Sequence, residues 1–177
     1  MAVLFLDTPQ STFGTQFWSS ITGSVTRDAT AARDPLGLSS WKCDSGAGDA
    51  AAYLSTASIP AQRRVSAYFY FTAFPSSTIR LFECGNAGAQ GVSCRITSGG
   101  ILQLWNNVTE AQVGGNGTTL SLNALYRLSL ANNGSPITAA KLFLDSTEDI
   151  NVTGVSITYS ASSFYIGWFS APGANKV

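Results

Sequence analysis

The chain has 177 residues, 45% hydrophobic and only 11% charged, and its ten basic and ten acidic residues give a net charge of zero. Histidine is absent, which excludes Ser–His–Asp and Cys–His catalysis, and without CxxC spacing a zinc site is disfavoured too. A neutral chain without an apolar run of about 18 residues gives no basis for nucleic-acid binding or for insertion into a membrane.

The length is typical of one domain, and we assign residues 1–177 to a single domain without an internal linker. The apolar residues 3–6 predict a strand and not a signal peptide, because no basic segment precedes them and Asp7 follows. Weaker strand signals follow at residues 24–27, 38–43 and 50–57. Residues 29–34 and 123–127 are each long enough for a helical turn, but no longer helical periodicity is present.

The clearest strand signal lies at residues 65–74. Val65, Ala67 and Phe69 alternate there with polar or half-polar residues, among them Tyr68 and Tyr70, so that one strand face is apolar. Turn residues separate the later signals, which is typical of two packed sheets made of about a dozen short strands. Further strands are predicted at residues 79–84, 91–97, 101–105, 108–113, 126–130, 137–145, 155–159 and 164–168.

Two cysteines flank a glycine-rich stretch that connects two apolar runs, a pattern that predicts a hairpin. Pairing that is symmetric about this stretch would place Cys84 opposite Cys94, within reach of a disulfide. Strand parity opposes this pairing, because Cys84 alternates with Phe82 whereas Cys94 alternates with Val92. The alternative is three buried thiols, including Cys43.

Six segments occur in an order that is similar to a known family: VSAYFYF, IRLF, GILQL, LYRL, KLFLD and FYIGW, at residues 65–71, 79–82, 100–104, 125–128, 141–145 and 164–168. Over roughly residues 50–170 the chain resembles the concanavalin A-like lectin/glucanase family in its laminin-G-like form. The resemblance implies an all-β fold, a two-sheet antiparallel β-sandwich of the jelly-roll kind. Members of this family often occur in bacteriophage structural proteins.

The chain departs from the family pattern in several places. Leu125 stands where tryptophan is usual, and Ser146 follows Asp145 where glycine is common. The acidic strand motif E-x-D-x-x-E of the glucanase branch is absent. The family usually adds a closing strand beside the N-terminal one, whereas this chain ends at Val177. We therefore expect either an open sheet edge or a strand supplied by another subunit.

A glycosidase would need two carboxylates across a cleft, and Glu83 and Glu110 are the candidates from separate strands. Each also fits an outward polar position of an alternating strand, which is the favoured interpretation. The prediction is therefore that the protein is not an enzyme.

Laminin-G-like domains sometimes bind calcium in loops, so the resemblance makes calcium the cofactor to consider. Asp145, Glu148 and Asp149 would supply oxygen ligands from one loop. The favoured alternative is a solvated turn with no cofactor.

Carbohydrate binding needs aromatic rings for stacking and amides for directional hydrogen bonds. Trp105 is the first candidate, with Asn106 and Asn107 predicted to form a two-residue hairpin connection. Tyr68 and Tyr70, on one strand face, are the second. Because Trp105 shares its parity with neighbouring strand residues, a role in covering the core is the favoured alternative.

The resemblance and the low charge together predict a non-enzymatic bacteriophage virion protein, a head decoration, fibre or tail component displaying a lectin-like jelly roll that adheres to host glycans. Its partners would be other virion proteins, in a homo-oligomer or a capsid or tail lattice. Its location would be the virion surface after synthesis in the host cytoplasm. The assembly contacts are expected at Val3, Phe5, Phe169 and Val177. The alternative is a free-standing carbohydrate-binding module.

Overall fold

The computed structural model describes residues 20–22, 24–28, 40–44, 50–55, 63–86, 90–134, 136–157 and 163–169. Side-chain surroundings are described for most of residues 64–157. Every element in these ranges is a strand or a turn, and no helix there is long and apolar enough to cross a membrane.

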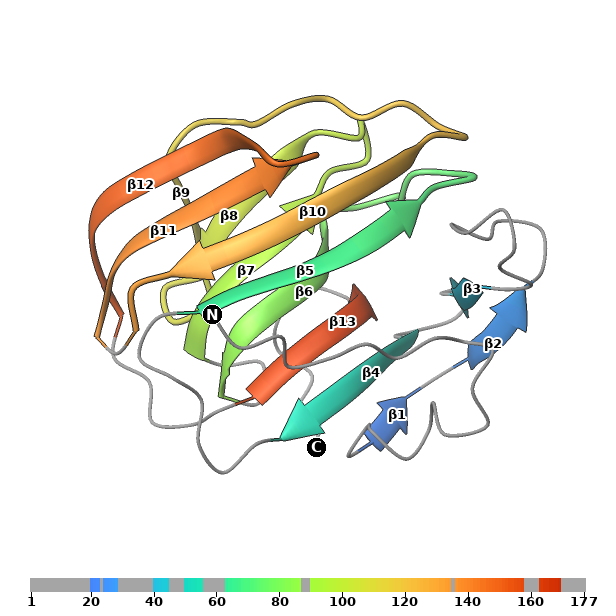
Figure 1. The fold of residues 1–177 in the computed structure, drawn as a ribbon, viewed down its shortest axis with the longest axis horizontal. Helices are drawn as coiled ribbons and strands as arrows, with labels where there is room; N and C mark the ends of the chain where they lie inside the picture. Colours follow the sequence, from blue (N-terminus) through green and yellow to red (C-terminus); the bar gives the residue numbers. More distant parts are fainter. Residues whose placement is uncertain are drawn as a thin grey trace.

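The strands are β1 (Ser20–Thr22), β2 (Ser24–Asp28), β3 (Ser40–Asp44), β4 (Ala50–Ser55), β5 (Arg63–Tyr70), β6 (Ile79–Asn86), β7 (Gln90–Ile96), β8 (Leu102–Asn106), β9 (Ala111–Val113), β10 (Leu125–Asn132), β11 (Ile137–Leu144), β12 (Thr147–Ile157) and β13 (Ser163–Phe169). The larger sheet has the order β1-β4-β13-β6-β7-β8-β9, the smaller sheet has the order β12-β11-β10-β5, and β2 pairs with β3 alone. All pairings are antiparallel. In Figure 1 the smaller sheet lies across the β6–β9 part of the larger sheet.

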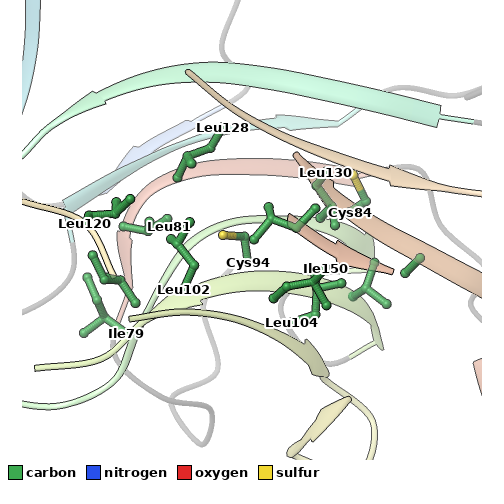
Figure 2. Close-up of a cluster of buried hydrophobic side chains, with 14 of the residues drawn as sticks. Ile79, Leu81, Cys84, Cys94, Leu102, Leu104, Leu120, Leu128, Leu130 and Ile150 are labelled. Atoms are coloured by element: carbon green, nitrogen blue, oxygen red, sulfur yellow. The ribbon is translucent and has the colours of Figure 1, made fainter. Parts of the chain in front are cut away.

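Strand alternation positions the core between these two sheets, as predicted. Ala67 of β5 is buried on the inner face, whereas its neighbour Tyr68 is exposed on the outer face. Figure 2 shows Leu128 and Leu130 of β10 pointing toward leucines and a cysteine of the larger sheet. Apolar burial of this kind contributes about 25 cal/mol per Å², so the shared core holds the two layers together. The fully buried core side chains include Leu81, Val92, Cys94, Ile96, Leu102, Leu104, Leu128, Leu130, Ile137 and Leu142.

The β6–β7 hairpin is centred one residue earlier than a Cys84–Cys94 bridge would require. Cys84 lies opposite Val92, and Cys94 lies opposite Phe82. The structure therefore corrects the disulfide alternative: both cysteines are buried free thiols. Burial, with a smaller contribution from the charge of Asp149, raises the pKa of the Cys94 thiol well above its ordinary value, so this thiol is inert.

The connection between β8 and β9 is longer than the predicted two-residue turn, and that prediction was wrong. Asn106 pairs with Ala111 at the ends of the two strands, and residues 107–110 form the turn. The side-chain Oδ1 of Asn106 accepts hydrogen bonds from the backbone N–H groups of Val108 and Thr109, at 2.8 and 3.4 Å. Asparagine therefore acts here as a local turn former.

The β11–β12 connection is tighter than predicted. Asp145 and Ser146 form a two-residue turn, and both have positive φ, at 47° and 80°. This conformation is the one that suits the twist of a hairpin, although glycine more commonly occupies it. Glu148 and Asp149, which were expected in a loop, lie within β12 instead.

The weaker N-terminal signals correspond to real strands, because β2, β3 and β4 lie where residues 24–27, 38–43 and 50–57 predicted them. The last strand of the described residues, β13, is an inner strand that pairs with both β4 and β6. The predicted strand at residues 3–6, the turn at residues 29–34 and any strand after β13 lie outside the described residues.

Candidate functional site

A polar patch occupies the outer face of the larger sheet where β6, β7, β8 and β9 lie side by side. One row across the strands contains Glu83, Ser93, Trp105 and Gln112, each opposite the next. The adjacent row contains Arg80, Arg95 and Gln103. Period-two alternation explains the placement, because the residues between them, such as Leu104, face the core.

Four charged residues form what we call the ionic cluster: Arg80, Glu83, Arg95 and Glu110. Arg80 Nη1 donates to Glu83 Oε2 at 2.6 Å, and Arg95 Nη2 donates to Glu110 Oε2 at 2.6 Å. Arg80 Nη2 also lies 3.6 Å from Glu110 Oε1, so that both glutamates contact the same guanidinium. The cluster therefore contains two positive and two negative charges in mutual contact.

Asn107 joins the two halves of this cluster. Its Oδ1 accepts from Ser93 Oγ at 2.6 Å and from Arg95 Nη2 at 3.1 Å. Its Nδ2 donates to Glu83 Oε2 at 3.1 Å. The backbone N–H of Asn107 also bonds to the carbonyl of Gly91, which fixes the 107–110 turn against β7. The turn thereby places Asn107 and Glu110 against the outer face of the sheet.

The ionic cluster is deeply buried for an outer face. The side chains of Arg80, Glu83 and Arg95 are 5%, 2% and 2% exposed, whereas that of Glu110 is 34% exposed. Burial lowers the pKa of the Arg95 guanidinium, and the hydrogen bond and charge of Glu110 oppose that effect. Buried charges are tolerated only when they are paired and hydrogen-bonded, which this arrangement provides.

Trp105 and three uncharged amide side chains lie together beside the ionic cluster. We call this group the amide rim: Gln103, Trp105, Gln112 and Asn116. Trp105 Nε1 donates to Gln103 Oε1 at 2.9 Å. Gln103 Nε2 and Gln112 Nε2 both donate to Asn116 Oδ1, at 2.9 and 3.1 Å. The Arg95 guanidinium lies 4.2 Å from the centroid of the indole ring and supports Trp105 from the ionic cluster. Trp105 remains partly exposed, and Asn116 is exposed.

Five residues were predicted to bind sugar, and the structure brings two of them, Trp105 and Asn107, together at one site. Trp105 and Asn107 both contact Arg95, whereas the described contacts of Asn106 are those of the turn. Tyr68 and Tyr70 are exposed on the outer face of the smaller sheet, which is the opposite side of the sandwich. Trp105 faces away from the core side chains of β8, so the expectation that it covers the sandwich core was wrong.

The two glutamates considered for catalysis are close together but are held in ion pairs. Glu83 lies on the outer face of its strand as expected but is buried there, and Glu110 lies in the 107–110 turn and not in a strand. Sequence reasoning did not identify Arg80, Arg95 or Ser93 as parts of one site. A usable signal was present, because these residues are polar at the outward positions of strands whose inward positions are apolar.

The three acidic residues proposed as calcium ligands face different partners. Asp145 Oδ1 accepts from the Arg127 N–H at 2.8 Å, and Asp149 Oδ1 accepts from Thr118 Oγ1 at 2.6 Å. Glu148 pairs with Lys141 at 2.7 Å, and this hydrogen bond lowers the pKa of Glu148. The structure thus does not bring the three together, and no group of three His, Cys, Asp or Glu residues that could hold a metal ion occurs among the described residues.

Comparison with known proteins supports the fold and leaves the family open. No family model matches the chain, and no curated protein matches it by sequence. Solved structures do match, among them the cellulose-induced protein Cip1, at a TM-score of 0.61 and 15% identity over 84% of this chain and 78% of that one.

Two further matches are similar in extent. The carbohydrate-binding module CBM66 from Bacillus subtilis has a TM-score of 0.54 and 11% identity over 85% of this chain and 88% of that one. An endo-β-1,4-glucuronan lyase from Trichoderma reesei has a TM-score of 0.58 and 14% identity over 85% and 79%. The chain spans only 18% of a Trypanosoma rangeli sialidase and 39% of a botulinum neurotoxin type C chain. At these identities the matches to Cip1, CBM66 and the lyase show the β-sandwich fold alone.

Proposed function

We propose that the protein is a non-enzymatic carbohydrate-binding protein and that the amide rim on the outer face of the larger sheet is its binding site. A pyranose ring presents a C–H face that stacks on an indole, and its hydroxyls both donate and accept hydrogen bonds. Side-chain amides match these hydroxyls because each carries a donor and an acceptor. The fold similarity to a carbohydrate-binding module supports the same proposal.

The placement of Trp105 is the observation that carries this proposal. Its ring is fixed by a hydrogen bond from Nε1 to Gln103 and by the guanidinium of Arg95, yet the side chain remains partly exposed. A ring that is held in one orientation loses little conformational freedom on binding, which favours affinity. The nearby exposed amide of Asn116 adds directional contacts.

Binding without turnover is supported by the surroundings of the two carboxylates. Glu83 and Glu110 accept hydrogen bonds from Arg80 and Arg95, so both are engaged in ion pairs. A glycosidase instead needs one protonated and one ionised carboxyl group facing the glycosidic bond. This arrangement favours a structural role for the glutamates beneath the rim.

The virion role is a second, finer part of the proposal. The family resemblance to bacteriophage structural proteins supports it, and so does the exposure of Tyr68, Tyr70 and Leu125 on the smaller sheet. This face would contact neighbouring copies or other virion proteins while the opposite face binds glycan. Mass measurement in solution tests the homo-oligomer: an assembly that dissociates in a Tyr68→Ser, Tyr70→Ser variant supports it, and a strict monomer at micromolar concentration contradicts it.

A glycan array followed by calorimetric titration tests the binding proposal. We expect Trp105→Ala and Gln112→Ala each to weaken binding at least tenfold, the loss that about 1.4 kcal/mol produces. Tyr70→Ala is the matched control, because it removes an aromatic side chain from the opposite face and should leave the titration unchanged. Thermal unfolding verifies that each variant is folded. An array without binding, or a loss caused by Tyr70→Ala alone, would contradict this site.

A further inference from the structure

We infer that the amide rim selects uncharged glycans and rejects uronic acids and other anionic sugars, an inference that rests on the proposed function. The ionic cluster beneath the rim, with its charges already paired, determines this preference. The ligand class is therefore a neutral polysaccharide or oligosaccharide whose ring stacks on Trp105 and whose hydroxyl groups contact Gln112 and Asn116.

Both guanidinium groups of the cluster already have carboxylate partners within the protein. Arg95 Nη2 donates to Glu110 at 2.6 Å and to Asn107 at 3.1 Å. Arg80 Nη1 donates to Glu83 at 2.6 Å. An anionic sugar would have to displace one of these glutamates, and that glutamate would lose its charged partner on a largely buried surface. Removing one partner of a buried ion pair is strongly unfavourable.

The side chains of the ionic cluster differ in exposure, and this difference adds a repulsion between Glu110 and an incoming carboxylate. Both arginine side chains are at most 5% exposed, whereas the side chain of Glu110 is 34% exposed. Glu110 is therefore the member of the cluster whose side chain is most accessible to solvent, although its Oε1 atom is buried. An approaching carboxylate meets Glu110 before it meets Arg95, and this like-charge approach discriminates against anionic ligands.

The rest of the described site offers no other cation. Among the side chains that the structure describes, the remaining basic residues are Arg64, Arg127 and Lys141, which all belong to the smaller sheet. The amide rim itself is uncharged, and its hydrogen bonds run through carboxamide groups. Hydroxyl groups of a neutral sugar match such groups without any charge being displaced.

Matched pairs of oligosaccharides isolate the effect of charge. Each pair shares a backbone and differs only in a carboxylate at C6: β-1,4-glucan and β-1,4-glucuronan, or β-1,4-mannan and β-1,4-mannuronan. For whichever backbone binds, we expect the neutral member to bind roughly fivefold or more tightly, as expected for two unit charges about 4 Å apart in water. The preference should shrink as sodium chloride rises from about 0.01 to 1 M, because salt screens exposed charges.

Glu110→Gln is the decisive variant, because it keeps the shape of the side chain and leaves Arg95 without its carboxylate partner. We expect the acidic member of the pair to gain affinity so that the preference narrows or inverts. Glu148→Gln is the matched control, since it removes an exposed, paired glutamate from the smaller sheet and should leave the preference unchanged. Equal or tighter binding of the acidic member to the wild-type protein overturns the inference and leaves glycan binding intact. Binding to no glycan at all overturns the proposed function itself.

Discussion

On the outer face of the larger sheet, the Arg95–Glu110 ion pair is 2.6 Å long and its side chains are 2% and 34% exposed. On the outer face of the smaller sheet, the Lys141–Glu148 pair is 2.7 Å long, but its side chains are 42% and 41% exposed. The two contacts have nearly the same length in different surroundings. Because solvent reaches both partners of the second pair but only Glu110 of the first, length alone does not determine what an ion pair contributes.

The cation–aromatic contacts on the two outer faces also have nearly the same length. Arg95 lies 4.2 Å from the ring centroid of Trp105, and Arg64 lies 4.1 Å from that of Phe143. Arg95 also donates to Ser93 and to residues of the 107–110 turn, so it belongs to a continuous network. The comparison indicates that the outer face of the larger sheet is organised around a continuous hydrogen-bonded network.

The largest expected effect comes from breaking the buried network. Arg95→Met should lower the free energy of unfolding by about 3–5 kcal/mol, because it leaves Glu110 without its close partner and removes the support of Trp105. Lys141→Met, the matched change on the smaller sheet, should cost less than about 1 kcal/mol. Urea unfolding measures both. Similar losses in the two variants would remove the distinction between the faces.

A substitution at Gly100 should lower the stability of the whole fold, and by less than Arg95→Met does. Gly100 has a φ of 78°, and an added Cβ would lie 2.5 Å from Cζ of Phe74. Gly100→Ala should therefore destabilise the fold by about 1–3 kcal/mol through strain and overpacking. Gly115→Ala is the control, because no atom lies within 4 Å of its added Cβ. If Gly100→Ala leaves the melting temperature unchanged in thermal unfolding, the turn accommodates the added methyl group and the prediction fails.

The smallest expected effect is the coupling between Lys141 and Glu148. A double-mutant cycle should give a small coupling at low salt, and this coupling should vanish near 1 M sodium chloride. The same cycle on Arg95 and Glu110 should give a larger coupling that persists in salt, because solvent ions reach that pair poorly. A coupling on the larger sheet that salt abolishes would contradict the burial of its cluster.

The strands were predictable because alternation of apolar residues is a local property. The clear signals from residue 65 onward and the weaker ones at β2 to β4 correspond to strands of the structure. The first half of β12 was missed because Thr147, Glu148 and Asp149 are polar and carry little apolar alternation. This strand lies at the edge of its sheet, where polar residues are tolerated.

The candidate site was only partly predictable. Trp105 and Asn107 were identified as a pair, but the turn type was not, because Asn106 bonds to the backbone of its own turn. The disulfide alternative failed for a related reason: a shift of one residue in the centre of the β6–β7 hairpin separates Cys84 from Cys94. Hairpin register depends on turn geometry, which composition does not determine.

By itself, the sequence determined that the protein is an all-β sandwich and, for strands such as β5 and β10, which residues face inward. It could not determine which outward faces are covered, because alternation distinguishes two sides of a strand and not their surroundings. Only the tertiary structure placed the 107–110 turn against β7 and so joined Glu110 to the buried Arg80, Glu83 and Arg95 in one neutral cluster. That step depends on contacts between residues far apart in sequence, which form when the strands pair and the turn folds over them.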